Sequence, residues 1–326
     1  MENYKFVLPE EAQEALKGHV RTLRMMEIKL RTVFDDHRYD EVMIPTFEYT
    51  DLYRDISTGI EVERLFQFFN KDGKAISLRA DFTFPLARYH AHAALSVGRY
   101  CYFGKVYRKQ LSHKGRQSEI YQAGIELMGL DEITGDQECL TVLSQSLKTM
   151  SLSNVQTELG SAAFFRRLEH LIKDDGQLKT ILDYRDMSAM ELFVKEKVKD
   201  QVIDQKMANF LNQLITLTGK QEVFIAAKMY LEDETLLKAL NHLETLYSAF
   251  KDQFEDLTVD LAMVPKFNYY TGLMIKAYHL DAAEAIISGG RYDQLLQVFG
   301  RDSQAIGLSF NLDMLSELAD KEKQDD

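Results

Sequence analysis

Cysteine is scarce in this sequence, and long apolar runs are missing from it. The chain has two cysteines, Cys101 and Cys139, and neither belongs to a Cys-x-x-Cys pair. The simplest interpretation is a reduced cytoplasmic protein without a disulfide framework or a metal site. The first residues lack a basic segment followed by an apolar one, so we expect no signal peptide. No apolar run approaches the ~20 residues that span a bilayer, so we expect no membrane association.

Positive charge is also in short supply. The chain has 39 lysines and arginines against 51 acidic residues, a formal net charge of -12. Nucleic-acid binding depends on basic side chains that neutralise phosphates, so this balance makes a tRNA or DNA partner less expected. It leaves a protein partner or a small ligand open. A length of 326 residues allows two compact domains, or one large domain with an insertion.

Residues 100–129 have the pattern of two strands joined by a charged loop at 109–116. Side chains alternate between the two faces of a strand, so Gln122, Gly124 and Glu126 share one face of the second strand. The opposite face is apolar and comprises Tyr121, Ala123, Ile125 and Leu127. A solvent-exposed polar face is the ordinary interpretation. A glycine within a strand instead favours close approach of a ligand or backbone, and a pocket floor with Glu126 near a cation and Arg108 near an anion would suit an amino-acid zwitterion.

Residues 107–126 resemble motif 2 of the class II aminoacyl-tRNA synthetases, and the histidyl enzymes are the best match. Residues 34–48 resemble motif 1, which builds the subunit interface in that family, although any helix–strand corner has a similar pattern. In the Leu-Arg-Pro-acid-x-Thr segment of the histidyl family, the acid and the threonine contact the amino group of histidine. Asp81 and Thr83 occupy those positions here. The same two residues would also suit a helix N-terminus, and both interpretations can hold together.

Three further segments extend the resemblance toward the C-terminus. Residues 269–271 match the Tyr-Tyr-Thr that closes over the imidazole in the histidyl family. Residues 289–293 match its Gly-Gly-Arg-Tyr-Asp, and residues 306–310 occupy the start of motif 3. Five elements in the family's order cover residues 1–320.

The resemblance implies an α+β fold: a class II synthetase-like, mainly antiparallel sheet flanked by helices, with an all-helical insertion. Residues 161–254 contain apolar side chains at helical spacing and no proline, which indicates the insertion. We therefore expect a synthetase-like core domain at 1–160 and 255–320, the helical insertion at 161–254, and a charged, frayed tail at 321–326.

The sequence departs from the synthetases where they bind ATP. The activating arginine that precedes Tyr-Tyr-Thr in the family is replaced by Pro265, and the glycine next to it by Lys266. The arginine that ends motif 3 is replaced by Met314. Loss of one such donor typically costs about 10²–10³ in rate. Few residues follow motif 3 in this sequence, so we also expect no anticodon-binding domain.

These departures make the chain similar to the regulatory subunits of ATP phosphoribosyltransferase, a family with a synthetase core and no activity of its own. The resemblance implies a non-catalytic protein that activates a short-form catalytic subunit and mediates feedback inhibition by histidine. It also implies a homodimer within a hetero-octamer, and L-histidine as a regulatory ligand with no cofactor. The predicted histidine-binding residues are Asp81, Thr83, Arg108, Gln122, Glu126, Tyr269 and Tyr270.

Roles within that set follow from the family match and from charge. Asp81, Thr83 and Glu126 would hold the ammonium group with the support of Gln122, and Arg108 would hold the carboxylate. The two tyrosines would shape the imidazole slot.

Two other functions remain open. A truncated synthetase-like ligase would use Arg108 and Arg116 to hold the phosphates of ATP. A pure interaction scaffold would have a vestigial pocket, although buried polar groups such as Glu126 and Gln122 are costly without a ligand.

Overall fold

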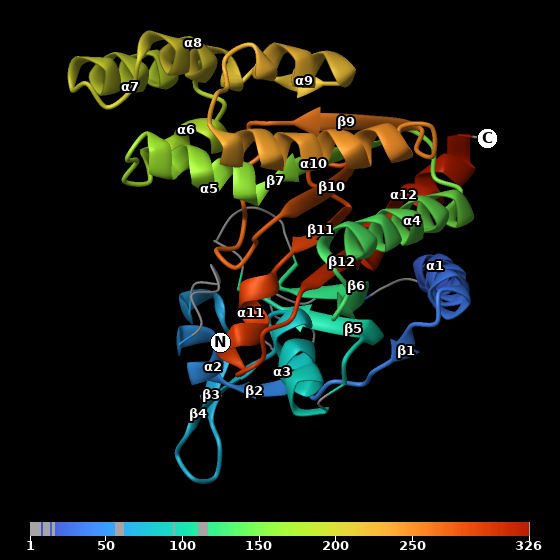
Figure 1. Ribbon diagram of the computed structural model, residues 1–326. Coiled ribbons are helices and arrows are strands. Elements are labelled where there is room, and N and C mark those ends of the chain that lie inside the picture. Colours follow the sequence, from blue (N-terminus) through green and yellow to red (C-terminus); the bar gives the residue numbers. More distant parts are fainter. Residues whose placement is uncertain are drawn as a thin grey trace, which may run out of the picture.

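A nine-stranded sheet forms the centre of the molecule, and a three-stranded sheet lies beside it (Figure 1). The computed structural model describes residues 8, 14, 17–55, 62–93, 95–109 and 117–325. The large sheet consists, in spatial order, of β1 (Asp40–Glu41), β5 (Gly98–Tyr107), β6 (Glu119–Met128), β12 (Ala305–Asn311), β11 (Ile287–Arg291), β10 (Leu273–His279), β7 (Val155–Ser161), β9 (Asp256–Asp260) and β8 (Thr218–Gly219).

Most of these strands run antiparallel to their neighbours. The exceptions are the pairs β1–β5 and β7–β9, which are parallel. The small sheet has the order β2 (Phe47–Tyr49), β4 (Ala75–Leu78) and β3 (Gln67–Phe69), and is wholly antiparallel. The predicted mainly antiparallel α+β fold is therefore confirmed.

Three helices cover one face of the large sheet: α1 (Lys17–Asp36), α4 (Glu132–Met150) and α12 (Leu312–Asp325) (Figure 1). The buried side chains beneath them include Ala123, Ile125 and Leu127, so the apolar face predicted for β6 is confirmed. The opposite face carries the short elements α2 (Thr50–Asp55), η1 (Val62–Arg64), α3 (Thr83–Ala93) and α11 (Asp293–Val298). No helix among the described residues is both long enough and apolar enough to span a bilayer.

The segment between β7 and β9 is mostly helical. It contains α5 (Ala162–Leu171), α6 (Gln177–Asp183), α7 (Met187–Lys199), α8 (Gln205–Leu214), α9 (Gln221–Lys228) and α10 (Glu234–Phe250). Side chains of Ser161, Asp186, Asp204 and Asp233 accept hydrogen bonds from backbone N–H groups at four of the helix starts. In Figure 1 α7, α8 and α9 form the layer farthest from the small sheet.

Two expectations need correction. The insertion is not wholly helical, because β8 pairs antiparallel with β9 and extends the large sheet. The C-terminal residues up to Asp325 continue α12 instead of fraying, which their helix-forming side chains favour. Residues 8–11, with a proline followed by two acids, have the pattern of a helix start, but residues 9–11 lie outside the described residues.

Candidate functional site

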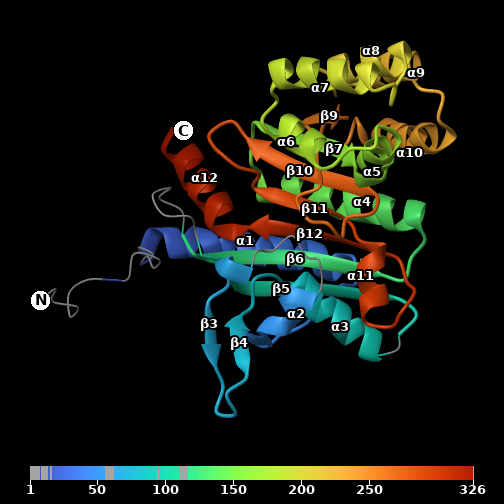
Figure 2. The ribbon, with the colours of Figure 1, turned by 90° about the vertical axis from the view of Figure 1, so that its left-hand side faces the viewer.

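A pocket opens over the large sheet where β5, β6, β12 and β11 lie side by side (Figure 2). The space within it, including the part that is open to solvent, is about 530 Å³. All seven residues that the sequence nominated contribute to its lining: Asp81, Thr83, Arg108, Gln122, Glu126, Tyr269 and Tyr270. They come from the start of α3, the end of β5, β6, and the loop before β10. The structure thus brings together residues up to 189 positions apart, from Asp81 to Tyr270.

Glycines make the floor of the pocket flat. Gly307 on β12 lies opposite Glu126 on β6, and a Cβ atom at Gly307 would be 1.9 Å from Oε2 of Glu126. Any other residue at 307 would therefore displace that carboxylate. The close approach expected at Gly124 is made by the protein itself, because a Cβ atom there would be 2.2 Å from the hydroxyl of Tyr102 and 2.5 Å from the backbone carbonyl oxygen of Leu308. The space over Gly124 belongs to a side chain of the protein and not to a ligand.

Tyr102 is held by a stack of planar groups. Its ring lies parallel to that of Phe82, with centroids 4.0 Å apart. The guanidinium carbon of Arg79 lies 4.3 Å from the centroid of the Phe82 ring, which is cation–π distance. Arg79 also donates to the carbonyls of Lys105 at 2.8 Å and Ile44 at 2.6 Å. The stack thereby ties the wall of the pocket to the backbone of two neighbouring segments.

Glu126 is the buried acid of the pocket, with 2% of its surface exposed. Thr83 Oγ1 donates to its Oε1 at 2.7 Å, and the hydroxyl of Tyr292 donates to its Oε2. Burial raises the pKa of Glu126 to about 8, against the opposing effect of these two hydrogen bonds. A pKa near 8 favours the protonated acid near neutral pH, and a cation beside the carboxyl group would favour its ionisation.

Asp81 has the helix-start role considered for it, while its contact with an amino group stays a prediction. Its Oδ1 accepts from the backbone N–H of Phe84 at 3.1 Å, which caps the first turn of α3. Its Oδ2 is buried without a hydrogen-bond partner. Burial raises the pKa of Asp81 to about 7, while nearby Arg108 acts in the opposite direction. A buried acceptor atom without a donor favours a ligand that supplies one.

Two basic side chains also line the pocket. Nε of Arg108 donates to the carbonyl of Ala80 at 2.7 Å, which fixes the direction of its side chain. Lys266 also lines the pocket. Desolvation and the charge of Arg108 lower the pKa of Lys266 to about 8. The pocket thus combines two acids with two bases.

Aromatic rings close the pocket from the side of the loop before β10. Phe267 stacks on Tyr269 with centroids 5.0 Å apart and an interplanar angle of 6°. Tyr269 in turn meets the edges of Phe84, Tyr270 and Tyr292. Ring faces and hydroxyl groups side by side suit a small aromatic ligand that also hydrogen-bonds.

Comparisons with known proteins agree with this geometry. The family model described as histidyl-tRNA synthetase matches residues 11–315. A protein of Lactococcus lactis subsp. cremoris named ATP phosphoribosyltransferase regulatory subunit is 44% identical, over 96% of this chain and 97% of that protein. A protein of the same name from Lactococcus lactis subsp. lactis is 36% identical, over 99% and 98%. The chain belongs to the ATP phosphoribosyltransferase regulatory subunit family.

A solved structure supports the same family. The crystal structure of an ATP phosphoribosyltransferase regulatory subunit/histidyl-tRNA synthetase from Bacillus halodurans C superposes with a TM-score of 0.86 at 25% identity, covering 97% of this chain and 84% of that one. The histidyl-tRNA synthetase-like fold of this family member is thus established by sequence and by structure.

Several lining residues of this regulatory-subunit family member were not assigned a role from sequence. Tyr292 belongs to the Gly-Gly-Arg-Tyr-Asp motif, but only the fold shows that its hydroxyl reaches Glu126. Lys266 was interpreted as a loss, because a glycine stands there in the synthetases. Sequence reasoning also missed Phe82, Tyr102, Phe267, Ser288 and Ser309. For the two serines the signal was their place on β12, which is next to β6, and on β11, which is next to β12.

The two replaced arginine positions lie in apolar surroundings. Met314 packs against the main hydrophobic core under the sheet. Pro265 is buried. Neither position offers a cation to the pocket, which agrees with the regulatory name of the relatives.

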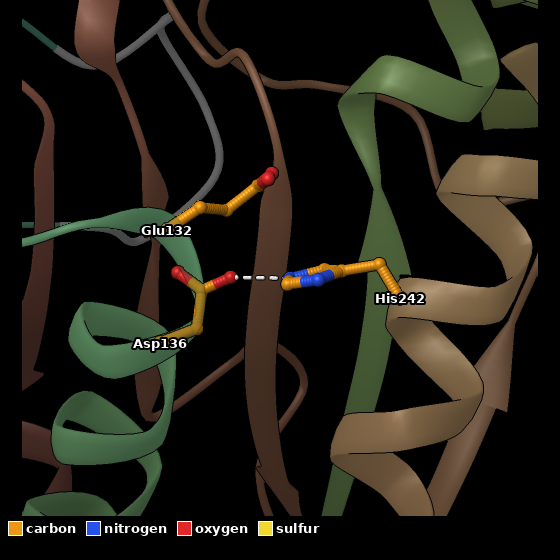
Figure 3. A group of neighbouring side chains, drawn as sticks. All are labelled: Glu132, Asp136 and His242. Carbon is orange, nitrogen blue, oxygen red and sulfur yellow. Dashed lines mark hydrogen bonds and ion pairs between the residues drawn. The ribbon is translucent and has the colours of Figure 1, made fainter.

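A second cluster lies outside the pocket, where α4 faces α10 (Figure 3). Glu132, Asp136 and His242 place one donor atom each within 4.8 Å of one another. His242 Nε2 lies 2.7 Å from one Asp136 oxygen, and Arg291 donates to the other at 2.7 and 2.9 Å. The donor set is one that metals use, but the guanidinium of Arg291 opposes a second cation there. We interpret the cluster as an ion-pair network that joins the insertion to the core.

Proposed function

We propose that this chain is a non-catalytic regulatory subunit of ATP phosphoribosyltransferase. In this role it activates a short-form catalytic subunit and mediates feedback inhibition by histidine in the first step of histidine biosynthesis. The observation that carries the proposal is the pocket, in which acidic, basic and aromatic groups are arranged as a free amino acid with an aromatic side chain would require.

Each part of histidine has a complementary partner in this proposal. The ammonium group donates to the carboxylate of Glu126 and to Asp81 Oδ2. Among the described residues, no group donates a hydrogen bond to Asp81 Oδ2. A cation between the two acids offsets the desolvation that raises their pKa values to about 7 and about 8. The imidazole ring lies against the tyrosine hydroxyls and ring faces, where its nitrogens donate or accept. Arg108 stands on the carboxylate side.

A regulatory role without catalysis is supported by the replacement of two arginines that synthetases use for amino-acid activation. Adenylate formation concentrates negative charge on phosphate, and fixed cations stabilise that charge in the transition state. Pro265 is buried and Met314 packs against the core, so neither substitutes for a guanidinium. The second candidate function is a truncated synthetase-like ligase. The observation that favours it is the retention of Arg108 in the pocket.

The proposed assembly is a homodimer of this chain within a hetero-octamer, through the segment that resembles motif 1. Apolar side chains of that segment and its neighbour are exposed in the single chain. Met43 is 93% exposed, Phe47 58% and Tyr49 55%. Burial of these side chains against a second copy would remove a contiguous apolar face from water. No tRNA partner is part of the proposal.

The test is an activity assay of a short-form ATP phosphoribosyltransferase catalytic subunit, with and without this chain and then with L-histidine. We expect activity to appear on mixing and to fall when histidine is added. Activity that does not change on mixing would contradict the regulatory role. Histidine-dependent ATP–pyrophosphate exchange by the chain alone would support the ligase instead.

A further inference from the structure

Lys266 is the one lining residue with a charge that the family pattern does not account for, since it stands where the synthetases have glycine. Its ammonium lies 5.6 Å from the centroid of the Phe267 ring. Phe267 is itself stacked on Tyr269, so the aromatic wall orients the lysine toward the pocket rim. The side chain retains exposed surface and lines the cavity at the same time. It is therefore accessible to a ligand that enters from solvent.

The charges around Lys266 favour an anion. In the part of the chain that the structure describes, no carboxylate lies within ion-pair distance of its ammonium. Arg108 is the nearest strong influence after desolvation, and Lys276 adds to it, so both lower the pKa of Lys266. Glu284 acts in the opposite direction and does not cancel them. An anion next to two cations relieves their mutual repulsion.

The acids of the pocket set the direction of the ligand. Among the described residues, Asp81 Oδ2 has no hydrogen-bond donor, and the groups that donate to Glu126 are two neutral hydroxyls. An ammonium group is held at that end. The carboxylate of the same zwitterion then points away from the acids, toward the basic lining.

We propose that Lys266, together with Arg108, binds the α-carboxylate of the amino acid in this pocket, and that it makes the pocket selective for ligands with a free carboxylate. The inference rests on the proposed function, because it takes histidine as the ligand. It adds a specificity residue that arises at the position adjacent to the lost activating arginine. In this proposal, the segment that supports activation in the synthetases contributes a carboxylate contact through Lys266 instead.

The experiment compares two ligands that differ only at the carboxylate. Titration calorimetry measures L-histidine and L-histidinol, in which a hydroxymethyl group replaces the carboxylate, binding to the wild-type chain and to Lys266→Met. We expect Lys266→Met to weaken L-histidine binding about 10-fold, which allows for screening of a partly exposed ion pair, and to change histidinol binding less than about 3-fold. Lys266→Arg, which retains the charge, should recover most of the loss for L-histidine.

The matched control is Lys276→Met on β10. It removes the same charge close to Lys266 but from a side chain that does not line the pocket. A loss of affinity for both ligands alike, or an equal effect of Lys276→Met, would overturn the inference, because neither is specific to the carboxylate. Unchanged L-histidine binding in Lys266→Met would overturn it as well. A wild-type chain that binds no L-histidine would instead contradict the proposed function itself.

Discussion

At the scale of single residues, burial disfavours ionisation of the two acids that line the pocket, Asp81 and Glu126. Glu126 is fully enclosed, and the two hydroxyl groups that contact it only partly replace water. A pKa of about 8 favours the protonated form of Glu126 near neutral pH, and a cation beside the carboxyl group would favour its ionisation. We therefore expect the binding of a cationic group at this residue to be coupled to proton release.

Glu126→Gln tests this coupling. Below pH 8 the wild-type chain must release a proton before Glu126 can contact an ammonium group, so its affinity for L-histidine should rise between pH 7 and pH 8 and then level off. The rise is at most about 10-fold per pH unit for one proton. The variant should bind about 10-fold or more weakly at pH 8 and lack most of this pH dependence. Titration calorimetry in buffers of different ionisation enthalpy counts the protons.

The same pKa shift of Glu126 predicts how the unfolding free energy of the chain without ligand depends on pH. The pKa of Glu126 in the folded chain, about 8, exceeds its ordinary value of 4.5. The stabilisation that the protonated Glu126 side chain gives the folded chain is thus fully present below pH 4.5, and it is lost as the pH rises through about 8. Equal pH dependence of unfolding for wild type and Glu126→Gln would contradict the assigned pKa.

At the scale of elements, strand pairing determines where side chains are allowed. β12 lies beside β6 with Gly307 opposite Glu126, so the absence of a side chain on one strand creates room for a carboxylate from the next. Helix packing has a similar role on the other face. There α4 supplies Asp136 to a buried arginine of β11 and to a histidine of α10.

Gly307→Ala should therefore separate binding from folding. The added methyl group would overlap Oε2 of Glu126 and approach the carbonyl of Ile125 at 2.8 Å. We expect a loss of about 1–3 kcal/mol in unfolding free energy and a greater than 10-fold loss of histidine affinity. Gly18→Ala on α1 is the control, since a Cβ atom at Gly18 would have nothing within 4 Å and alanine favours helix. Calorimetric binding and urea unfolding of both variants make the comparison.

Asp136→Asn tests the ion-pair network in Figure 3. Arg291 is 1% exposed, and loss of the Asp136 carboxylate would leave the partly exposed Asp293 as its remaining ion-pair partner among the described residues. We expect the unfolding free energy to fall by about 3–5 kcal/mol. Asp51→Asn breaks the exposed pair with Arg54 and should cost less than about 1 kcal/mol. Similar urea midpoints for the two variants would mean that the network adds no more than a surface pair.

At the scale of the whole molecule, the three-stranded sheet projects away from the large sheet (Figure 2). Phe47 and Phe68 pack edge to face on it at 5.7 Å, and Phe69 is 75% exposed. Aromatic side chains on a sheet surface are unusual without a covering partner. The proposed homodimer offers that cover.

Phe47→Asp should weaken self-association by placing a charge within this apolar face. Sedimentation velocity is expected to show a shift from dimer toward monomer. Leu192→Asp on α7 is the matched control, since Leu192 is 69% exposed but lies in the insertion. If both variants sediment as the wild type does, the small sheet is not part of the dimer contact.

From the amino-acid sequence one can predict the strand pattern, the helical character of most of the insertion, and seven residues that line the pocket. Local periodicity and short motifs carry that information, because β6 alternates faces and Asp81 begins a helix regardless of the rest of the chain. The folded chain adds three facts that no motif predicts: Tyr102 lies over Gly124, Tyr292 donates to Glu126, and Lys266 lines the pocket. These contacts join segments far apart in sequence, and their geometry depends on strand order and register, which no local pattern contains.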